Sequence, residues 1–528
     1  MALAACVLLD AARGEEFTFH ARSRVERPPG SGRFVPVERT VRLDPKATAL
    51  IVCDMWDRHW CPSATARVRE MAPRMNAALE AARRRGALII HAPSGTMDFY
   101  KNTPQRRRAQ AAPPYQAKTP LRGWAGWDPG REPPLPIDDS DGGCDDPSPP
   151  KPRSVWRRQI DLIRIAPDDA ISDSGSEIFG LLQSRGIRHV ILMGVHLNMC
   201  VLGRPFGIRQ MVLQGMDVYL MRDLTDTMYN PRRRPYISHF AGTDLMVEHV
   251  ERHWCPSVTS ADLLGGRPFR FQADRRPRIV FVIGENEYRT WETLPAFARR
   301  VLAWRGLRAD YATSSPDPND FHWTNWQALA RADLVWLSVR RRAAPPQMLR
   351  LLRAHLEAGR PLIGIRTASH AFAPRGAAPA RAKEQGLAVW EKFDPEVLGG
   401  NYHGHYKPGP TPRVTPAPRA AQSPVLKGVD LADAKAFGSL YKTSPLAKDA
   451  APLLYGAVSG RPAEPVAWTR LYGPNRARVF YTSLGHPDDF RERWFRHLLL
   501  NAVCWALDKP PPPEYIETPW PEKVPAAP

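Results

Sequence analysis

The sequence predicts an α/β protein with two domains, each a doubly wound parallel sheet in a three-layer arrangement. The chain has 528 residues, which exceeds the usual size of one domain. Hydrophobic residues make up 43% of it, which is enough for folded cores. Apolar runs of strand length alternate with helix-length stretches in two separate parts of the chain. That alternation is typical of parallel strands joined by crossover helices.

The first domain is expected at 41–266. Residues 49–53 form a continuous apolar run, which is typical of a strand buried on both faces of a parallel sheet. Glycines end the stretches that we interpret as helices. After this strand we expect, in order, a helix at 65–85, strands at 87–91 and 160–165, a helix at 176–185, a strand at 189–195, a helix at 201–213 and a strand at 217–222.

Three segments in and around this domain lack the strand and helix pattern. We expect 1–40 to be an N-terminal extension, 103–154 to be a long insertion rich in Pro, Gly and Asp, and 267–277 to be a basic linker. Closely spaced carboxylates at 138–146 could bind Ca²⁺, but they do not fit the twelve-residue EF-hand loop. We therefore favour a solvated acidic turn at that place.

The second domain is expected at 278–508. Its elements should be a strand at 278–284, a helix at 293–304, strands at 308–313 and 333–339, a helix at 346–358, strands at 361–365 and 479–484, and a helix at 490–506. Residues 408–424 are predicted to form a Pro-rich loop, and 509–528 a Pro-rich tail.

The net charge of the chain is strongly positive. Lys and Arg number 74 and Asp and Glu number 54, which gives a formal charge of +20. This balance could indicate an anionic partner, but the Arg residues are spread along the chain, so a compositional bias is favoured. We predict a small-molecule substrate and no nucleic-acid partner. No apolar run approaches the ~18–20 residues of a membrane span, so we predict no membrane partner either. A homo-oligomer is left open.

The start of the chain bears on its location. The apolar stretch at 2–9 has no basic residue before it, which makes a poor secretory signal. We expect a cytoplasmic protein, or a periplasmic or secreted one if the true start lies upstream. The seven cysteines do not indicate a disulfide-dense scaffold.

Asp54 and Cys200 are predicted to meet at one edge of the first sheet. Asp54 follows the strand at 49–53, and Cys200 lies just past the strand at 189–195. Ligands usually bind at the carboxyl ends of parallel strands. A thiol at the start of a helix has a lowered pKa because the positive end of the helix dipole is close. An Asp on a neighbouring strand can take its proton. We predict Cys200 as a nucleophile and Asp54 as its base.

Residues 50–57 and the segment Gly-Val-His-Leu-Asn-Met-Cys-Val at 194–201 resemble the isochorismatase-like cysteine hydrolases, a superfamily that includes the nicotinamidases. The resemblance implies a three-layer α/β sandwich, an Asp-Lys-Cys triad that cleaves an amide or imide through a thioester, and a cis peptide at 195–196. Asp54 and Cys200 match two members of the triad. The strand at 160–165, where the Lys is expected, contains none. Arg164 is its nearest cation, and we predict it as the third catalytic residue.

Three residues near this pair are predicted to contact the substrate: Asp57, His196 and Asn198. The resemblance also implies an Asp and His metal site like that of the nicotinamidases, with Asp57, His59, His91 and Asp98 as possible ligands. Their spacing does not reproduce the nicotinamidase motif, so we predict no metal and no cofactor.

The sequence His-Trp-Cys-Pro-Ser occurs twice, at 59–63 and at 253–257. Two His and two Cys could hold a tetrahedral Zn²⁺ if the copies met in space. A disulfide between Cys61 and Cys255 is another option in an oxidising compartment. A coincidence of two packing motifs is favoured over both.

Four segments of the second domain resemble the ThuA-like, or trehalose-utilisation, family: 399–403, 465–468, 478–486 and 501–506. The family shares the fold of class I glutamine amidotransferases, whose Cys nucleophile sits at a strand-to-helix turn. Arg366 occupies that position here, so we do not expect glutaminase activity. The resemblance implies an association with carbohydrate metabolism.

Several polar residues could form a pocket in this second domain. We predict that the ligand is bound by Arg366, His370, His403 and His486, with His405, Glu285 and Glu287 close by. An Arg and several His among aromatic residues would suit a polyol or an anionic sugar. The alternative is that the histidines belong to the core.

The sequence therefore predicts a cysteine hydrolase for an amide or related C–N bond of a small molecule, fused to a domain for a carbohydrate-derived ligand. The alternative is a non-catalytic ligand-binding or scaffolding protein with a degenerate triad.

Overall fold

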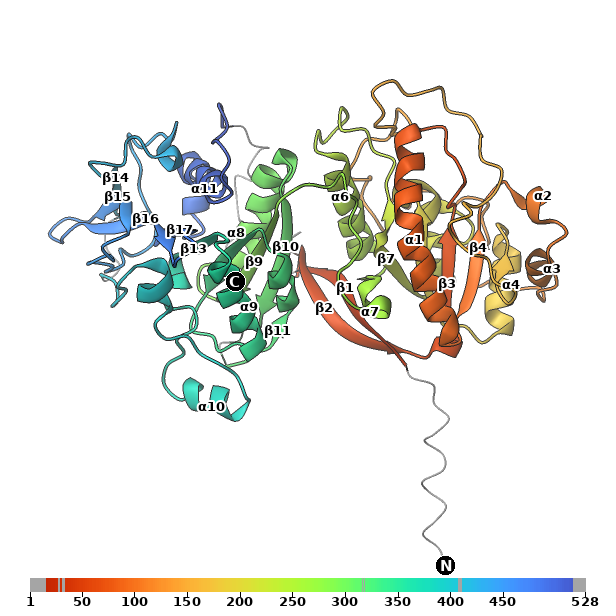
Figure 1. Ribbon diagram of the computed structural model, residues 1–528, viewed down its shortest axis with the longest axis horizontal. Coiled ribbons are helices and arrows are strands. Elements are labelled where there is room, and N and C mark those ends of the chain that lie inside the picture. Colours follow the sequence, from red (N-terminus) through yellow and green to blue (C-terminus); the bar gives the residue numbers. More distant parts are fainter. Residues whose placement is uncertain are drawn as a thin grey trace, which may run out of the picture. The chain divides into compact units, whose positions relative to one another are not determined.

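The computed structural model describes residues 16–515, except for 27–28, 31–33, 316, 318 and 407–410. The chain divides into two compact units (Figure 1). Unit 1 comprises Met1–Arg27 and Pro36–Arg275, and unit 2 comprises Pro28–Val35 and Arg276–Pro528. Each unit contains one large sheet with helices, so the predicted α/β class is confirmed. Both sheets are mixed, whereas parallel sheets were predicted.

The sheet of unit 1 has eight strands in the order β2-β1-β8-β7-β6-β3-β4-β5. The strands from β8 to β5 in this order pair in parallel, and β1 is antiparallel to β8. β1 and β2 fall in the segment that we expected to be an extension. The bounds are β1 Phe17–Glu26, β2 Phe34–Leu43, β3 Thr48–Cys53, β4 Leu88–Ala92, β5 Ala170–Ile171, β6 His189–Val195, β7 Asp217–Asp226 and β8 Ser257–Val258.

Right-handed crossovers place α1 on one face of this sheet and α4 and α5 on the other. Met71 and Leu79 of α1 pack on Leu50 and Val52 of β3 in one buried core. The helices are α1 Pro62–Arg84, α2 Met97–Tyr100, α3 Pro104–Gln110, α4 Gly175–Ser184, α5 Ile208–Leu213, α6 His239–His253 and α7 Ala261–Leu264, with short helical turns at Pro45–Ala47 and Leu197–Val201.

Two predicted elements of unit 1 are wrong. Residues 160–165 form a loop whose Ile160 N–H donates to the Met55 carbonyl, so the segment follows the loop after β3 and does not join the sheet. The strand before α4 is the short β5. The helix expected at 201–213 is interrupted, because Pro205 and Gly207 stand between the turn at 197–201 and α5.

A disulfide joins Cys61 at the start of α1 to Cys144 in the insertion. The Cys61–Cys255 disulfide, an option that we did not favour, is therefore excluded, and Cys255 is a buried free thiol. The acidic centre of the insertion also differs from a solvated turn, because its carboxylates bind protein groups. Asp145 accepts from Arg67 at 2.8 Å, and Asp141 accepts from Asn230 at 2.8 Å. The insertion is thus tied to the body of unit 1.

The sheet of unit 2 has nine strands in the order β11-β10-β9-β12-β13-β17-β16-β15-β14. β10, β9, β12, β13 and β17 are parallel, and the strands on either side of them are antiparallel. The bounds are β9 Arg278–Gly284, β10 Arg308–Ser314, β11 Trp323–Thr324, β12 Leu334–Val339, β13 Leu362–Ile365, β14 Arg413–Pro416, β15 Ala451–Ala457, β16 Glu464–Tyr472 and β17 Ala477–Thr482.

Helices cover both faces of this sheet. Successive side chains of a strand point to opposite faces, so one strand contributes to the core on each side. Ile279 and Phe281 of β9 pack with α8 and α11, whereas Val280 and Val282 pack with α9. Unit 2 is therefore three-layered. The helices are α8 Thr290–Phe297, α9 Pro346–Glu357, α10 Ala378–Glu384 and α11 Arg493–Ala506, with short helical turns at Ala298–Leu302, Ala303–Arg305, Trp326–Arg331, Arg366–His370, Asp394–Leu398, Pro424–Leu426 and Asp489–Arg491.

Some predicted segments need correction or fall outside the description. β14 lies within the expected loop at 408–424, and α8 begins earlier than the helix expected at 293–304. The stretch at 2–9 and most of the tail, 516–528, lie outside the described residues. Among the helices of the described ranges, none combines the length and apolar character that a bilayer span requires.

Candidate active site

Asp54 occupies the carboxyl end of β3, in the middle of the unit 1 sheet. Its backbone has a φ of 47°, in the left-handed region that non-glycine residues rarely adopt, and its side chain is fully buried. One carboxylate oxygen, Oδ1, accepts the Ser94 N–H at 2.7 Å. The other, Oδ2, accepts from Nε of Arg204 at 3.0 Å. The carboxylate is thus held in one orientation by groups from two directions.

Cys200 lies in the helical turn Leu197–Val201, which follows β6, the strand beside β3. The Cys200 thiol and the Asp54 carboxyl group lie close enough for each to shift the pKa of the other. The peptide bond Val195–His196 is cis, as the resemblance implied. The structure therefore places the predicted nucleophile beside the predicted base.

The protonation state of this pair differs from our expectation of an acidic thiol. Burial raises the pKa of Cys200 well above its usual value, and the negative charge of Asp54 raises it further. Burial also raises the pKa of Asp54, while Arg204 opposes that rise. Cys200 therefore rests as a thiol beside the Asp54 carboxyl group. Such a pair can form the thiolate when the proton moves to Asp54 during attack on a substrate.

The cation at this site is Arg204, not Arg164. Arg164 is exposed on the loop at 160–165, where its backbone N–H donates to Asn76. The residue that directly follows β5, where the resemblance places the Lys, is Ser172. Sequence reasoning missed Arg204, although the signal was present. Arg204 lies four residues after Cys200, a spacing that puts two side chains on the same side of a helical turn.

The residues predicted to contact the substrate have different surroundings. His196 is buried, and its Nε2 has no hydrogen-bond partner among the described residues. Asn198 uses its amide inside the protein, donating to Asp139 at 2.7 Å and accepting from the Met228 N–H at 2.9 Å. Asp57 accepts the backbone N–H at position 157 at 3.0 Å. His196 thus keeps an unpaired buried nitrogen, whereas Asn198 and Asp57 hold loops.

An aromatic cluster stands beside this turn and was not predicted. The rings of Trp56 and Trp156 stack with centroids 4.2 Å apart, and His59 stacks on Trp156 at 5.9 Å. The edge of His196 meets His59 at 5.0 Å. Burial lowers the pKa of His59 to about 4 and that of His196 well below its usual value, so both imidazoles are neutral at neutral pH.

The possible metal ligands do not come together. His91 is buried between Gln159 and Asp169, with its ring nitrogens 3.0 Å from an oxygen of each. No group of three or more His, Cys, Asp or Glu side chains in the described part of the chain is arranged to hold a metal ion.

Arg366 directly follows β13 in unit 2, with a φ of 44° and a buried side chain. Its guanidinium lies between the rings of Tyr288 and Tyr441, 4.3 and 4.5 Å from their centroids. It donates to the carbonyls of Ser483 at 2.6 Å and Ser439 at 3.3 Å. The guanidinium is thus enclosed by protein. Its positive charge lies buried beneath the carboxyl ends of the parallel strands.

His370 lies in the same turn, stacked on the ring of Tyr402 at 4.6 Å. Burial, and then the charges of Arg341 and Arg340, lower the pKa of His370 to about 2. The imidazole is therefore neutral and available as a hydrogen-bonding group.

The other predicted histidines are divided. His486 is half-buried, and its ring lies edge-on to Tyr288 at 6.3 Å. His403 and His405 are exposed, with the ring of His405 6.3 Å from that of Tyr441. The structure thus brings His370 and His486 near Arg366 and leaves His403 at the surface.

Both glutamates predicted near this pocket are used by the protein. Glu285 accepts the backbone N–H groups of Thr290 at 2.7 Å and Tyr288 at 2.6 Å, so it shapes the loop after β9. Glu287 forms an ion pair with Arg340 at 2.6 Å. Neither carboxylate is free to bind a ligand.

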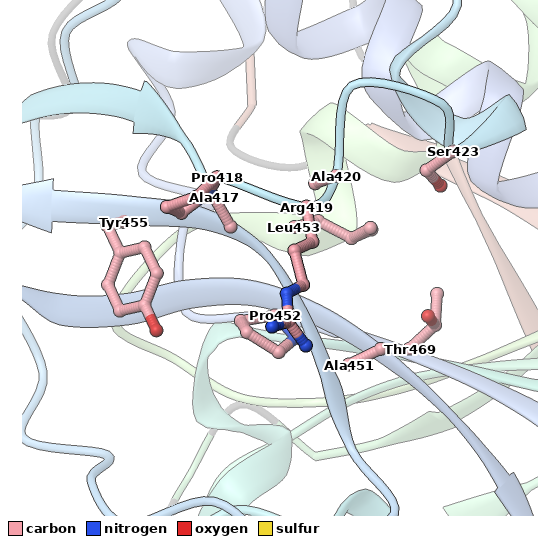
Figure 2. Close-up of a pocket in the computed structure, with 10 residues that line it drawn as sticks. All are labelled: Ala417, Pro418, Arg419, Ala420, Ser423, Ala451, Pro452, Leu453, Tyr455 and Thr469. Carbon is pink, nitrogen blue, oxygen red and sulfur yellow. The ribbon is translucent and has the colours of Figure 1, made fainter.

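A separate cavity of about 600 Å³ lies beside β14 and β15, away from all predicted site residues. Figure 2 shows Arg419, Tyr455 and Thr469 around it. The full lining is Ala417, Pro418, Arg419, Ala420, Ser423, Ala451, Pro452, Leu453, Tyr455 and Thr469. None of the predicted site residues lines this cavity.

Comparison with solved structures finds several similar proteins. A cysteine hydrolase from Pseudomonas syringae is 17% identical, with 42% of this chain and 92% of that chain covered and a TM-score of 0.27. An isochorismatase family protein from Burkholderia thailandensis is 14% identical, with 41% and 93% covered and a TM-score of 0.24. A ThuA-like protein from Parabacteroides merdae is 19% identical, with 45% and 92% covered and a TM-score of 0.33.

Comparison with family models and with curated proteins gives two further findings. No curated protein matches the chain. The family model ThuA, described as trehalose utilisation, matches residues 279–506. That match spans all the parallel strands of unit 2 and the helix α11 that closes it. The similarity to the ThuA family therefore lies in unit 2.

Proposed function

We propose that unit 1 is a cysteine hydrolase of the isochorismatase-like kind, acting on an amide or related C–N bond of a small molecule. The observation that carries this proposal is the placement of the Cys200 thiol beside the buried Asp54 carboxylate, whose Oδ2 accepts from Arg204 at 3.0 Å. A nucleophile, its base and a cation that keeps the base ionised are the parts that such a reaction requires.

In the first half of the proposed reaction, Asp54 takes the thiol proton while the Cys200 sulfur attacks the carbonyl carbon. The tetrahedral intermediate collapses to a thioester when the C–N bond breaks, and the leaving nitrogen takes the proton from Asp54. In the second half a water molecule attacks the thioester, Asp54 accepts the water proton, and that proton returns to the sulfur as the carboxylic acid leaves. Arg204 stabilises the ionised form of Asp54 throughout.

The surroundings favour a small, planar substrate. Trp56, Trp156 and His59 present a stacked aromatic wall, and a planar amide gains stacking energy on such a surface. His196 adds one unpaired buried nitrogen for a hydrogen bond.

A second candidate for unit 1 is a ligand-binding site without turnover. Two observations favour it: Ser172 stands where the resemblance expects the Lys, and burial raises the pKa of Cys200. The two candidates differ in whether Cys200 forms a covalent bond to the substrate.

For unit 2 we propose the binding of a carbohydrate-derived ligand at the carboxyl edge of its parallel strands. The match to a family described as trehalose utilisation supports this proposal, as does the mixture of Arg, His and Tyr side chains at that edge.

The test for unit 1 is a hydrolysis screen of small amides, imides and activated p-nitrophenyl esters with the full chain. For any substrate found, Cys200→Ala should abolish turnover, and the matched variant Cys255→Ala should not, because Cys255 is a free thiol packed in the core. Unchanged turnover in Cys200→Ala would remove the proposal and leave the binding function.

A further inference from the structure

The loops at one edge of the unit 2 sheet lie where ligands of α/β proteins usually bind. In the sheet, β10 lies on one side of β9, and the later strands β12 and β13 lie on the other side of β9. Ligands occupy the carboxyl ends of strands beside such a switch in strand order. The loops after β12 and β13 are also joined there, because the N–H of Arg341 donates to the carbonyl of His370 at 2.9 Å.

Two arginines at this edge have no acidic partner. Among the described residues, no carboxylate lies within ion-pair distance of Arg341 or Arg375, whereas Arg340 beside them pairs with Glu287. After burial, the charges that act most strongly on Arg341 are those of Arg375 and Arg340, so like charges are gathered here. Arg341 is half-buried and Arg375 is exposed. A half-buried positive charge without a counter-ion costs free energy, which an anion bound at Arg341 would recover.

Two acidic groups near this edge are held by backbone N–H groups and do not supply that anion. Glu285 is held by backbone N–H groups of its own loop. Asp489 accepts the N–H groups of Gly485 and His486 at 2.7 and 2.8 Å. Arg366 adds a further positive charge from behind, enclosed between two tyrosine rings. The potential at the edge is therefore positive.

An aromatic surface adjoins these arginines. The ring of Tyr402 is half-buried, stacks on His370 and lies 4.6 Å from the ring of Tyr441. Burial, Arg341, Arg340, Arg375 and Arg366 all lower the pKa of His370, so four guanidinium groups converge on one neutral imidazole. An apolar ring face beside a cluster of cations suits a ligand with a flat body and one acidic group.

We propose that Arg341 and Arg375 bind the anionic group, a carboxylate or a phosphate, of a small ligand whose body lies against Tyr402. The anion site is argued from the arginines alone. That the body of the ligand is a sugar rests on the function proposed for unit 2.

The experiment is calorimetric titration of the full chain at low salt with four probes: glucuronate, glucose 6-phosphate, inorganic phosphate and glucose. At least one acidic sugar should bind about tenfold more tightly than glucose, and added salt should weaken it. The double variant Arg341→Met/Arg375→Met should weaken it by about 30-fold, the usual effect of losing charge-assisted hydrogen bonds. Arg360→Met is the charge-matched control. Arg360 precedes β13 and so lies at the amino ends of the parallel strands, away from the proposed site.

The outcomes separate this inference from the function on which it builds. Preference for glucuronate or for glucose 6-phosphate supports the inference and identifies the anionic group. Inorganic phosphate binding as tightly as either sugar, with loss in the double variant, supports the anion site and contradicts a carbohydrate ligand. Glucose binding as tightly as the acidic sugars overturns the inference and leaves the carbohydrate function standing. Equal weakening by Arg360→Met, or no binding of any probe at millimolar concentration, also overturns it.

Discussion

Replacing Asp54 by Asn is expected to lower kcat/KM of unit 1 by about 10²–10⁴-fold, because a positioned general base contributes that much. Asn preserves the shape of the side chain and can still accept the Ser94 N–H. It cannot take the proton of the Cys200 thiol, which in the wild type lies beside the carboxylate. The measurement is kcat/KM on a substrate that the wild type hydrolyses, with the melting temperature as a check on the fold.

Glu132→Gln is the matched control for this variant. Glu132 is also a fully buried carboxylate of unit 1 in an ion pair, with Arg209 at 2.6 Å. Its loss should lower the melting temperature and leave kcat/KM nearly unchanged. Full activity in Asp54→Asn, or an equal loss of kcat/KM in Glu132→Gln, would contradict the role of Asp54 as a base.

Replacing Arg204 by Met should lower the free energy of unfolding by about 3 kcal/mol, because it leaves a buried carboxylate without its cation. It should also change the pH dependence of hydrolysis. Burial raises the pKa of Asp54 and Arg204 opposes that rise, so the variant should have a still higher pKa at this carboxyl. The base is the ionised carboxylate, so the acidic limb of the pH–rate profile should move to higher pH.

Two further variants make this test specific. Arg204→Lys keeps the positive charge and should retain most of the wild-type pH profile. Arg209→Met breaks the Arg209–Glu132 ion pair and should lower stability without moving the acidic limb. An unchanged profile in Arg204→Met would show that Arg204 does not control the ionisation of Asp54.

The pairing of Asp54 with Cys200 could be predicted because it depends on strand order alone. A continuous apolar run predicts a central parallel strand, and two neighbouring strands of this kind bring their carboxyl ends together. Arg204 and the direction of the thiol pKa could not be obtained in this way. The effect of burial on the thiol exceeds that of its position at the start of a helical turn, and burial is known only once the side chains are packed.

The antiparallel strands and the disulfide were not predicted, because neither has a continuous apolar run or another local pattern in the sequence. β1 and β14 are strands with antiparallel neighbours, and they carry alternating polar and apolar residues without a continuous apolar run. Cys144 lies in an insertion without periodic pattern, so nothing local indicates that it meets Cys61. In unit 2 the turn of Arg366 was placed correctly from its motif. The enclosure of Arg366 by Tyr288 and Tyr441 depends on loops that are distant in the sequence.

The rate at which iodoacetamide alkylates Cys200, followed as a function of pH by peptide mass spectrometry, tests most directly whether Asp54 accepts the thiol proton. The buried thiols Cys53, Cys255 and Cys504 serve as internal references in the same sample. We predict that Cys200 reacts faster than all three and at a rate nearly independent of pH from neutral to mildly alkaline conditions. In Asp54→Asn the rate should instead rise about tenfold per pH unit, as for an unassisted thiol. A wild-type Cys200 that reacts no faster than Cys504, or whose rate rises with pH as steeply as in the variant, would contradict the account.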